Sequence, residues 1–179
     1  MSFYTLFDTT IGRCGAAWNS AGFAGVQLPE KTDTDTRTRL LRFNPTAEEE
    51  TPKGAIRRGV EEIQSLLEGK KKSLRALQLD MRGIADFHAR VYETARIIPP
   101  GKTRTYGEIA RAIGQPHAAR AVGQALGRNP FAIVVPCHRV IGADGRMIGF
   151  SANGGIGVKL RLLEIEGAIT QLDLFSVQD

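Results

Sequence analysis

The pattern of turn formers and apolar residues changes near residue 83, and this change constrains the fold more than any other feature of the chain. Residues 3–28 alternate apolar side chains with glycine-containing turns, which predicts a small antiparallel sheet of short strands joined by hairpins. Residues 31–46 are polar and predict a loop that leads into a short ordered segment, whereas apolar positions at helical spacing over residues 52–67 predict a helix. After the change, three or four helices and one strand are predicted. We therefore expect an α+β protein with a β-rich structural domain over residues 1–83 and a mostly helical domain over residues 84–179.

Start and stop signals place three helices in the second domain. Apolar residues at helical spacing over residues 87–98 predict the first, which Pro99-Pro100-Gly101 ends. Thr105 and Glu108 form a capping-box pattern at the start of the second, and a glycine-containing turn leads from it into the third, over residues 117–126. Two short helices joined in this way are a helix-turn-helix candidate, although a plain structural helical hairpin has the same pattern.

The third of these helices carries few large side chains. Ala119, Ala121 and Gly123 let its backbone approach a large surface closely, and Arg120 is the long side chain that projects from this stretch. Basic residues also concentrate here, because residues 90–146 contain nine Arg and Lys against three Asp and Glu, which leaves the rest of the chain close to neutral. Such an excess is typical of a protein that binds an anionic partner such as nucleic acid, with a solvated basic face as the alternative.

A cysteine and a histidine are adjacent at the end of an apolar run. Residues 131–135 are rich in β-branched side chains and predict a short buried strand, which Pro136 ends because proline lacks a backbone N–H. Cys137 is then expected on a rigid support, as a reactive thiol rather than an inert core cysteine. The nearby basic residues favour the nucleophilic thiolate: Arg128, His138, Arg139 and Arg146. In an extended segment adjacent side chains point to opposite faces, so we expect no direct Cys–His hydrogen bond and a structural role for Arg139.

Cysteine and histidine counts exclude other kinds of site. The two cysteines, Cys14 and Cys137, and the three histidines lack the paired close spacings of structural zinc, so we expect no metal and no cofactor. The apolar residues 3–7 are followed at once by Asp8, and no apolar run approaches the length of a membrane span. We therefore expect a cytoplasmic protein without a structural disulfide.

Taken together, these motifs resemble the O6-alkylguanine-DNA alkyltransferases, in particular the bacterial members. The resemblance is carried by Pro136-Cys137-His138-Arg139-Val140, by Ala118-Ala119-Arg120-Ala121-Val122-Gly123 and by Arg128-Asn129-Pro130, and it runs from about Phe87 to Gly167 in consistent order and spacing. It implies that the second domain binds DNA and accepts the alkyl group. Repair would occur by direct reversal: Cys137 takes an alkyl group from O6 of guanine in one irreversible, stoichiometric step.

The same resemblance implies a catalytic group of three residues. His138 would be linked to Cys137 through a water molecule and would help to generate the thiolate, while Glu166 would orient the histidine. Glu164, two residues away, is the alternative to Glu166.

It also implies how DNA is bound. The partner would be double-stranded DNA, approached from the minor groove by a monomer, with the damaged nucleotide flipped into a pocket. Arg120 would fill the space that the base leaves, and Tyr106 would crowd the 3′ phosphate and donate a hydrogen bond to the base. The small residues of the third helix would contact the groove: Ala119, Ala121 and Gly123. The substrate pocket would be lined by Tyr106, Val140, Phe150 and Ser151. Asn129 would hold the turn before the active-site strand.

Two other classes of protein share parts of this pattern. A non-catalytic protein that binds alkyl lesions, or a regulatory helix-turn-helix protein, would use the same basic helices, but Cys137 beside His138 argues against it. A cysteine hydrolase would need a direct Cys–His hydrogen bond, which an extended segment disfavours.

The segment at residues 150–155 is longer than the family pattern. The size of alkyl group that the family accepts is therefore not carried over to this chain.

Overall fold

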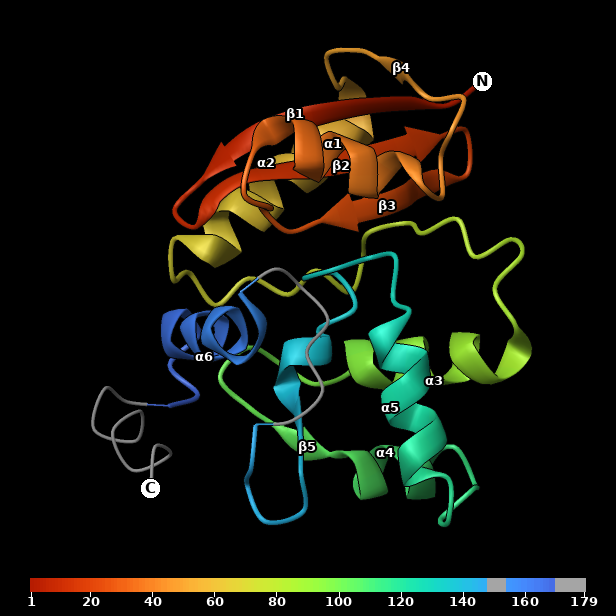
Figure 1. Ribbon diagram of the computed structural model, residues 1–179, viewed down its shortest axis with the longest axis vertical. Helices are drawn as coiled ribbons and strands as arrows, with labels where there is room; N and C mark the ends of the chain where they lie inside the picture. The colour runs from red at the N-terminus through yellow and green to blue at the C-terminus, as the bar shows by residue number, and fades with distance from the viewer. Residues whose placement is uncertain (148–153, 170–179) are drawn as a thin grey trace. The chain divides into compact units, whose positions relative to one another are not determined.

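The chain forms two compact units. The computed structural model describes residues 1–147 and 154–169 (Figure 1). One unit consists of Met1–Gly83 together with Pro130–Val134, and the other of Ile84–Asn129 together with Val135–Asp179. The sequence assigns residues 130–134 to the second domain, whereas in the structure they pack within the first unit.

A four-stranded sheet with the order β3-β2-β1-β4 forms the first unit. Strands β1 (Phe3–Thr9), β2 (Gly12–Asn19) and β3 (Gly22–Gln27) form an antiparallel meander, and the short β4 (Glu48–Glu49) pairs in parallel with β1. Gly22 is required at the second hairpin, since its φ is 126° and a Cβ there would lie 2.4 Å from the carbonyl oxygen of Gln78. The predicted small antiparallel sheet is confirmed.

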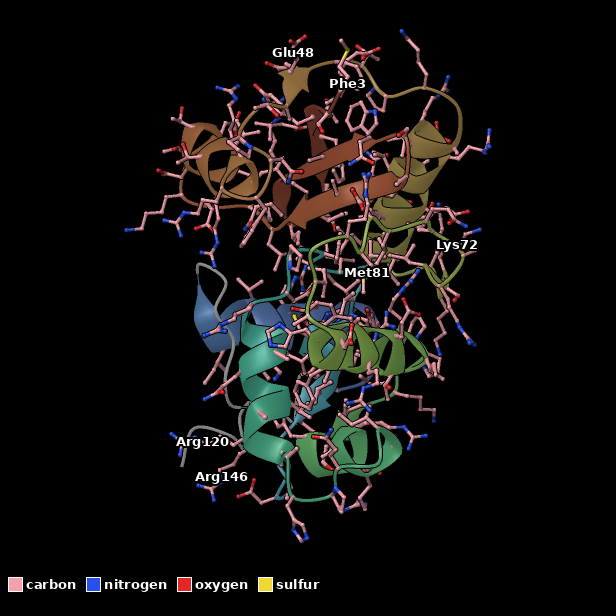
Figure 2. The ribbon with its side chains drawn as sticks, turned by 90° about the vertical axis from the view of Figure 1, so that its right-hand side faces the viewer. Phe3, Glu48, Lys72, Met81, Arg120 and Arg146 are labelled. Atoms are coloured by element: carbon pink, nitrogen blue, oxygen red, sulfur yellow. The ribbon has the colours of Figure 1, made fainter. Side chains whose placement is uncertain are left out.

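Helices α1 (Asp33–Leu41) and α2 (Gly54–Leu67) cover opposite faces of this sheet (Figures 1 and 2). The apolar face of α2 is buried, as its spacing predicts, and Gly59 lets the helix approach the Phe23 ring, because a Cβ there would lie 2.6 Å from Phe23 Cε2. The prediction of a loop at α1 was wrong. The Thr32 hydroxyl caps this helix by accepting from the Asp35 N–H, which offsets the low helix propensity of its threonines and aspartates.

The outer edge of β3 is paired with two segments that come from far along the chain. The backbone of Phe23 is hydrogen-bonded to the segment that contains Leu79. Val26 O accepts from Ala132 N at 3.0 Å, and Val26 N donates to Pro130 O at 2.9 Å. The edge is therefore covered rather than exposed.

The second unit is mainly helical. Helices α3 (Asp86–Arg96), α4 (Tyr106–Ala112) and α5 (Ala119–Gly127) pack on one another, and the Tyr92 hydroxyl ties α3 to α5 by donating to the Ala125 carbonyl at 2.9 Å. The other elements are β5 (Arg104–Thr105), a 3₁₀ turn η1 (Cys137–Arg139), β6 (Val140–Ile141), which pairs in parallel with β5, and α6 (Gly155–Ile165). The predicted α+β class is confirmed. In the described parts of the chain, no helix is both long and apolar enough to span a membrane.

Candidate active site

Two consecutive tight turns deliver Cys137, and the short strand predicted over residues 131–135 is not formed. Val134 N donates to Ala132 O at 2.8 Å across Ile133, whose φ is 72°, which fits the rarer, positive-φ γ-turn. Cys137 N donates to Val135 O at 2.8 Å across Pro136, whose φ of −80° and ψ of 66° are those of an inverse γ-turn. Most of the run is buried, although only its first residues pair with the sheet, at the edge of β3.

The Asn129 side chain fixes the second turn. Its amide donates to Val135 O at 2.9 Å, so one carbonyl accepts from both Asn129 and the Cys137 backbone. The same side chain also forms a hydrogen bond that lowers the pKa of the Cys137 thiol. Asn129 therefore holds the turn before the cysteine, the place expected for it, and also contacts the thiol.

Cys137 is a half-buried residue at the start of η1. Burial raises its pKa above the ordinary value, and the groups that oppose this are the Asn129 side chain, the charge of Lys159 and the backbone N–H groups of Cys137 and His138. The net effect is a raised pKa, so the Cys137 thiol is protonated at neutral pH in the absence of substrate. A base is then needed to generate the thiolate.

A histidine held by a carboxylate follows directly. His138 is buried, and its Nε2 lies 2.8 Å from Glu166 Oε1. Glu166 lies just after α6 and accepts two hydrogen bonds from Arg139, from Nε at 2.8 Å and from Nη2 at 2.7 Å. Arg139 Nη1 donates to the carbonyl of Ile98 at 2.6 Å. Arg139 is thus a structural residue, as expected. The bidentate contact of its guanidinium group fixes the carboxylate in one orientation.

The charges in this group determine which histidine nitrogen carries the proton. Burial raises the pKa of Glu166, but the hydrogen bonds from His138 and Arg139 outweigh it and lower the pKa to about 2, so the carboxylate is ionised. Burial lowers the pKa of His138, so the ring is neutral. A neutral ring beside an ionised acceptor carries its proton on Nε2, which leaves the lone pair on Nδ1. Nδ1 is buried and has no hydrogen-bond partner among the residues that the structure describes.

The 3₁₀ turn changes the argument about the adjacent cysteine and histidine. The sequence predicts an extended segment, in which the two side chains point to opposite faces, but residues 137–139 form a helical turn instead. Nδ1 still forms no direct bond to the sulfur. The expected separation is therefore present for a different reason, since the ring turns toward Glu166.

Lys159 is a residue that the sequence analysis missed. It is fully buried, its Nζ donates to the Val140 carbonyl at 2.6 Å, and it lies 5.8 Å from the centre of the Tyr106 ring. Burial lowers its pKa to about 8, and its positive charge lowers the pKa of Cys137. The signal was a lone charge on the apolar face of α6, where Lys159 is three and four residues before Leu162 and Leu163.

The cations expected around the thiol are arranged differently. Arg139 forms an ion pair with Glu166, and Arg146 forms one with Asp144 on the surface. Neither these two nor Arg128 is among the groups that lower the pKa of Cys137, whereas Lys159 is. Sequence proximity was therefore a poor guide to the charge that the sulfur experiences.

Tyr106 begins α4, where the predicted capping box is present: Thr105 Oγ1 accepts from Glu108 N at 3.1 Å, and Glu108 Oε2 accepts from Thr105 N at 2.7 Å. Burial, and then the negative charge that Cys137 would carry, raise the pKa of Tyr106 to about 12, so its hydroxyl remains a donor. Gly123 of α5 faces this ring, because a Cβ there would lie 3.6 Å from Tyr106 Cε1.

The remaining predicted residues fall into three groups. Arg120 is exposed at the start of α5, with Ala119 and Ala121 partly exposed beside it, and Figure 2 shows Arg120 projecting from the second unit. Val140 is fully buried, and it contributes its carbonyl to Lys159. Phe150 and Ser151 lie outside the described residues. Within the described ranges, no three His, Cys, Asp or Glu side chains are grouped as a metal site would need.

Comparison with known proteins points to one family. The matching family model, 6-O-methylguanine DNA methyltransferase, DNA binding domain, covers residues 86–168. A methylated-DNA–protein-cysteine methyltransferase of Mycobacterium bovis is 40% identical over 174 residues, which are 97% of this chain and 98% of the relative.

Solved structures agree with this assignment. The O6-methylguanine methyltransferase of Mycobacterium tuberculosis is similar with a TM-score of 0.76 and 40% identity, over 98% of this chain and 99% of that one. A crystal structure of Mycobacterium tuberculosis OGT in complex with DNA is similar with a TM-score of 0.75 and 39% identity, over 97% of this chain and 99% of that one. The resemblance inferred from the sequence is confirmed, and the chain belongs to the O6-methylguanine DNA methyltransferase family.

Proposed function

We propose that this chain repairs DNA by direct reversal, transferring an alkyl group from O6 of guanine in double-stranded DNA to Cys137 in a single turnover. The observation that carries the proposal is a half-buried cysteine followed by a buried, neutral histidine whose Nε2 is held by an ionised glutamate. The family supports the same reaction, since the Mycobacterium bovis relative is a methylated-DNA–protein-cysteine methyltransferase.

The transfer forms one bond and breaks one bond. The sulfur of Cys137 attacks the alkyl carbon, the new bond joins sulfur to carbon, and the bond between that carbon and guanine O6 breaks. The electron pair of the broken bond remains on the guanine, which takes up the proton that the thiol gave up. The products are unmodified guanine and an S-alkyl cysteine. Removing the alkyl group again would require a second nucleophile to displace the cysteine thiolate from an unactivated carbon, and the reaction supplies none, so the protein is used once.

His138 would remove the thiol proton. Its Nδ1 carries the free lone pair, and a water molecule between Nδ1 and the sulfur would relay the proton. Glu166 stabilises the imidazolium that forms, and Arg139 keeps Glu166 ionised, so the carboxylate orients the ring instead of taking the proton itself. Glu166, rather than Glu164, is the orienting carboxylate, since Glu164 pairs with Arg161 on the surface.

The charge that develops on sulfur would be stabilised by donors already in place. The backbone N–H groups of Cys137 and His138, the Asn129 amide and the Lys159 ammonium each lower the pKa of the thiol. Because they are fixed before substrate arrives, they stabilise the thiolate without a reorganisation cost at the moment of reaction.

The guanine O6 lies inside the double helix, so the nucleotide must be flipped out, at a cost of about a few kcal/mol of stacking. Arg120, exposed at the start of α5, would occupy the vacated space, and the small side chains of Ala119 and Ala121 would allow this helix to enter the minor groove. Tyr106 would donate a hydrogen bond to the flipped base, since its hydroxyl keeps its proton. Gly123, on the same helix, would add a further small residue to the surface that contacts the groove.

Four further assignments belong to this proposal. Val140 would line the base pocket together with Tyr106, and the same role is proposed for Phe150 and Ser151, which lie outside the described residues. The first domain supports the fold, and the second binds DNA and accepts the alkyl group. The protein acts as a monomer. It works in the cytoplasm.

The test is the mass of the protein after incubation with duplex DNA that contains O6-methylguanine. The wild-type chain should gain one methyl group, on the peptide that contains Cys137, and Cys137→Ala should gain none. Cys14→Ala is the matched control: Cys14 is fully buried and burial raises its pKa to about 12, so this variant should still gain one methyl group.

Folded wild-type protein that binds the damaged duplex without a gain of mass would contradict the proposal and favour the non-catalytic lesion-binding class. Repeated turnover of ester or peptide substrates would favour a cysteine hydrolase instead.

A further inference from the structure

A basic hollow lies in the first unit, on the helix that covers one face of the sheet. Its cations are Arg58 on α2 and Lys70, Lys71 and Lys72 just beyond the end of α2, and it is an open depression of about 510 Å³. Glu61 and Glu62 also line it. We refer to this group as the α2 basic hollow. Nothing in the reaction described above uses it, since the proposed alkyl acceptor and the proposed DNA-contacting helix belong to the second unit.

The backbone of the lysine run is fixed where it leaves the helix. Gly69, with a φ of 87°, follows the last residues of α2; its N–H donates to Leu66 O at 3.0 Å, and Lys70 N donates to Ser65 O at 3.1 Å. These two bonds form a Schellman motif, which determines the direction in which the chain continues. Lys72 N then donates to Lys70 O at 2.7 Å, which closes a second tight turn. The three lysines are therefore presented from an ordered backbone.

The charges of the hollow are only partly neutralised. Lys70 pairs with Glu68 at 2.7 Å and Lys72 with Glu62 at 3.3 Å, and the side chains of these two lysines are 68% and 47% exposed. Exposed pairs of this kind contribute little, so a phosphate group can replace the carboxylate at little cost. Lys71 and Arg58 form no ion pair with any residue that the structure describes. Figure 2 labels Lys72 in the segment that follows α2.

The simplest alternative is that these lysines only stabilise the helix. Cations beyond a helix C-terminus interact favourably with the helix dipole, and α2 has no basic residue in its last turn. One lysine is enough for that purpose, however, and Arg58 on the second turn of α2 is too far from the C-terminus to contribute, because the dipole effect is confined to the last turn. A hollow whose cations come from two places on the chain is better explained by an anionic ligand.

We propose that the α2 basic hollow binds the sugar-phosphate backbone of DNA, as a second contact made by the first unit outside the lesion-binding surface. The proposal rests on the proposed function, which supplies DNA as the partner. Lysine side chains suit this role because they neutralise phosphates as point charges and read no sequence. The contact adds affinity for undamaged and damaged duplex alike.

The test measures how binding to an undamaged duplex depends on salt, with the full chain and fluorescence anisotropy. The logarithm of the affinity falls with the logarithm of the salt concentration, with a slope of about −0.9 per phosphate neutralised. The variant Lys70→Gln/Lys71→Gln/Lys72→Gln should therefore have a slope that is smaller in magnitude by about 2 to 3. The matched control is Lys31→Gln/Arg42→Gln/Lys53→Gln, which removes three exposed charges from the same unit outside the hollow and should keep the wild-type slope.

An unchanged slope in the lysine variant, or an equal decrease in the control, overturns the proposal. An unchanged slope is also the result expected if the hollow binds an acidic protein instead of DNA. The thermal midpoint of each variant shows that the protein is folded. The outcome is separable from that of the proposed function, because the slope on undamaged duplex needs no alkyl transfer. Loss of methyl transfer with intact slopes would overturn only the repair reaction, whereas a wild-type chain that binds no duplex would overturn both.

Discussion

Two of the Arg–Glu pairs in the second unit have nearly equal distances and very different surroundings, which allows a direct test of what burial contributes. Arg139 Nη2 lies 2.7 Å from Glu166 Oε1, and the two side chains are 6% and 2% exposed. Arg161 Nη1 lies 2.8 Å from Glu164 Oε2, and those side chains are 57% and 25% exposed. Arg139→Met and Arg161→Met remove the same charge at the same distance from a carboxylate.

The expected losses differ by several kcal/mol. Arg161→Met should change the free energy of unfolding by less than about 1 kcal/mol, because an exposed pair is weak and screened. Arg139→Met leaves the buried Glu166 carboxylate with only His138, and it also removes the donor to the Ile98 carbonyl. Breaking a buried pair from one side costs about 3–5 kcal/mol, since the remaining charge is uncompensated.

Urea unfolding of the full chain, followed by circular dichroism, measures both losses. Arg139→Lys should fall between the wild type and Arg139→Met, since it keeps the charge but cannot form the two-pronged contact with Glu166. It also keeps the experiment informative if Arg139→Met does not accumulate as folded protein. Equal losses for the methionine variants at positions 139 and 161 would refute the reasoning that burial, rather than distance, decides the contribution of the pair.

Three further predictions follow from single contacts. Lys159→Met should slow methyl transfer to Cys137, measured as a second-order rate constant at pH 7, because the pKa of the thiol rises when this charge is removed; Arg161→Met is the control with an exposed cation. Gly59→Ala should destabilise the chain by about 1–3 kcal/mol in urea unfolding, since the new Cβ would lie 2.6 Å from the Phe23 ring, whereas Gly127→Ala, with nothing within 4 Å, should not. The hydrogen bonds from Arg82, and then from Asn19, hold the pKa of Asp80 well below its ordinary value of about 3.9, despite partial burial. The ionised carboxylate therefore stabilises the fold above that pH. This stabilisation is lost as the pH falls through the folded-state pKa. The difference in thermal midpoint between wild type and Asp80→Asn should therefore be constant above about pH 5 and shrink below about pH 4, and a difference that does not depend on pH would contradict this assignment.

Local patterns predicted the parts of the fold that local physics determines. The capping box at Thr105 and Glu108, the hairpins of the first sheet and the buried face of α2 each depend on residues within a few positions of one another, and each is present. The helix at residues 33–41 was missed because its propensity is low and its stability comes from the Thr32 cap and from the sheet beneath it. The run at residues 131–135 has strand composition, but which part of it pairs with β3 is decided by tertiary contacts.

The candidate site divides in the same way. Cys137 and His138 are adjacent in sequence, so their proximity was visible at once. Glu166, which holds both His138 and Arg139, is 28 and 27 residues away from them in the chain. The resemblance to a family supplied Glu166, but no pattern along the chain separates it from Glu164. Lys159 was overlooked because a charge on the apolar face of a helix is read as an irregularity until its buried partner, the Val140 carbonyl, is known.

The state of the resting thiol agrees with a protein that is consumed by its reaction. Burial raises the pKa of Cys137, so the sulfur is held mainly as the less reactive thiol, while His138 Nδ1 and the donors around the sulfur are already in position. A single-turnover acceptor loses its one repair event whenever its nucleophile reacts with a stray electrophile. A protonated thiol with an adjacent base limits that loss. The thiol gives its proton to the base, and the transfer is completed only when a bound guanine accepts the proton. Burial of the site opposes thiolate formation in the resting protein, and it therefore suits a nucleophile that reacts once and only with a base placed against it.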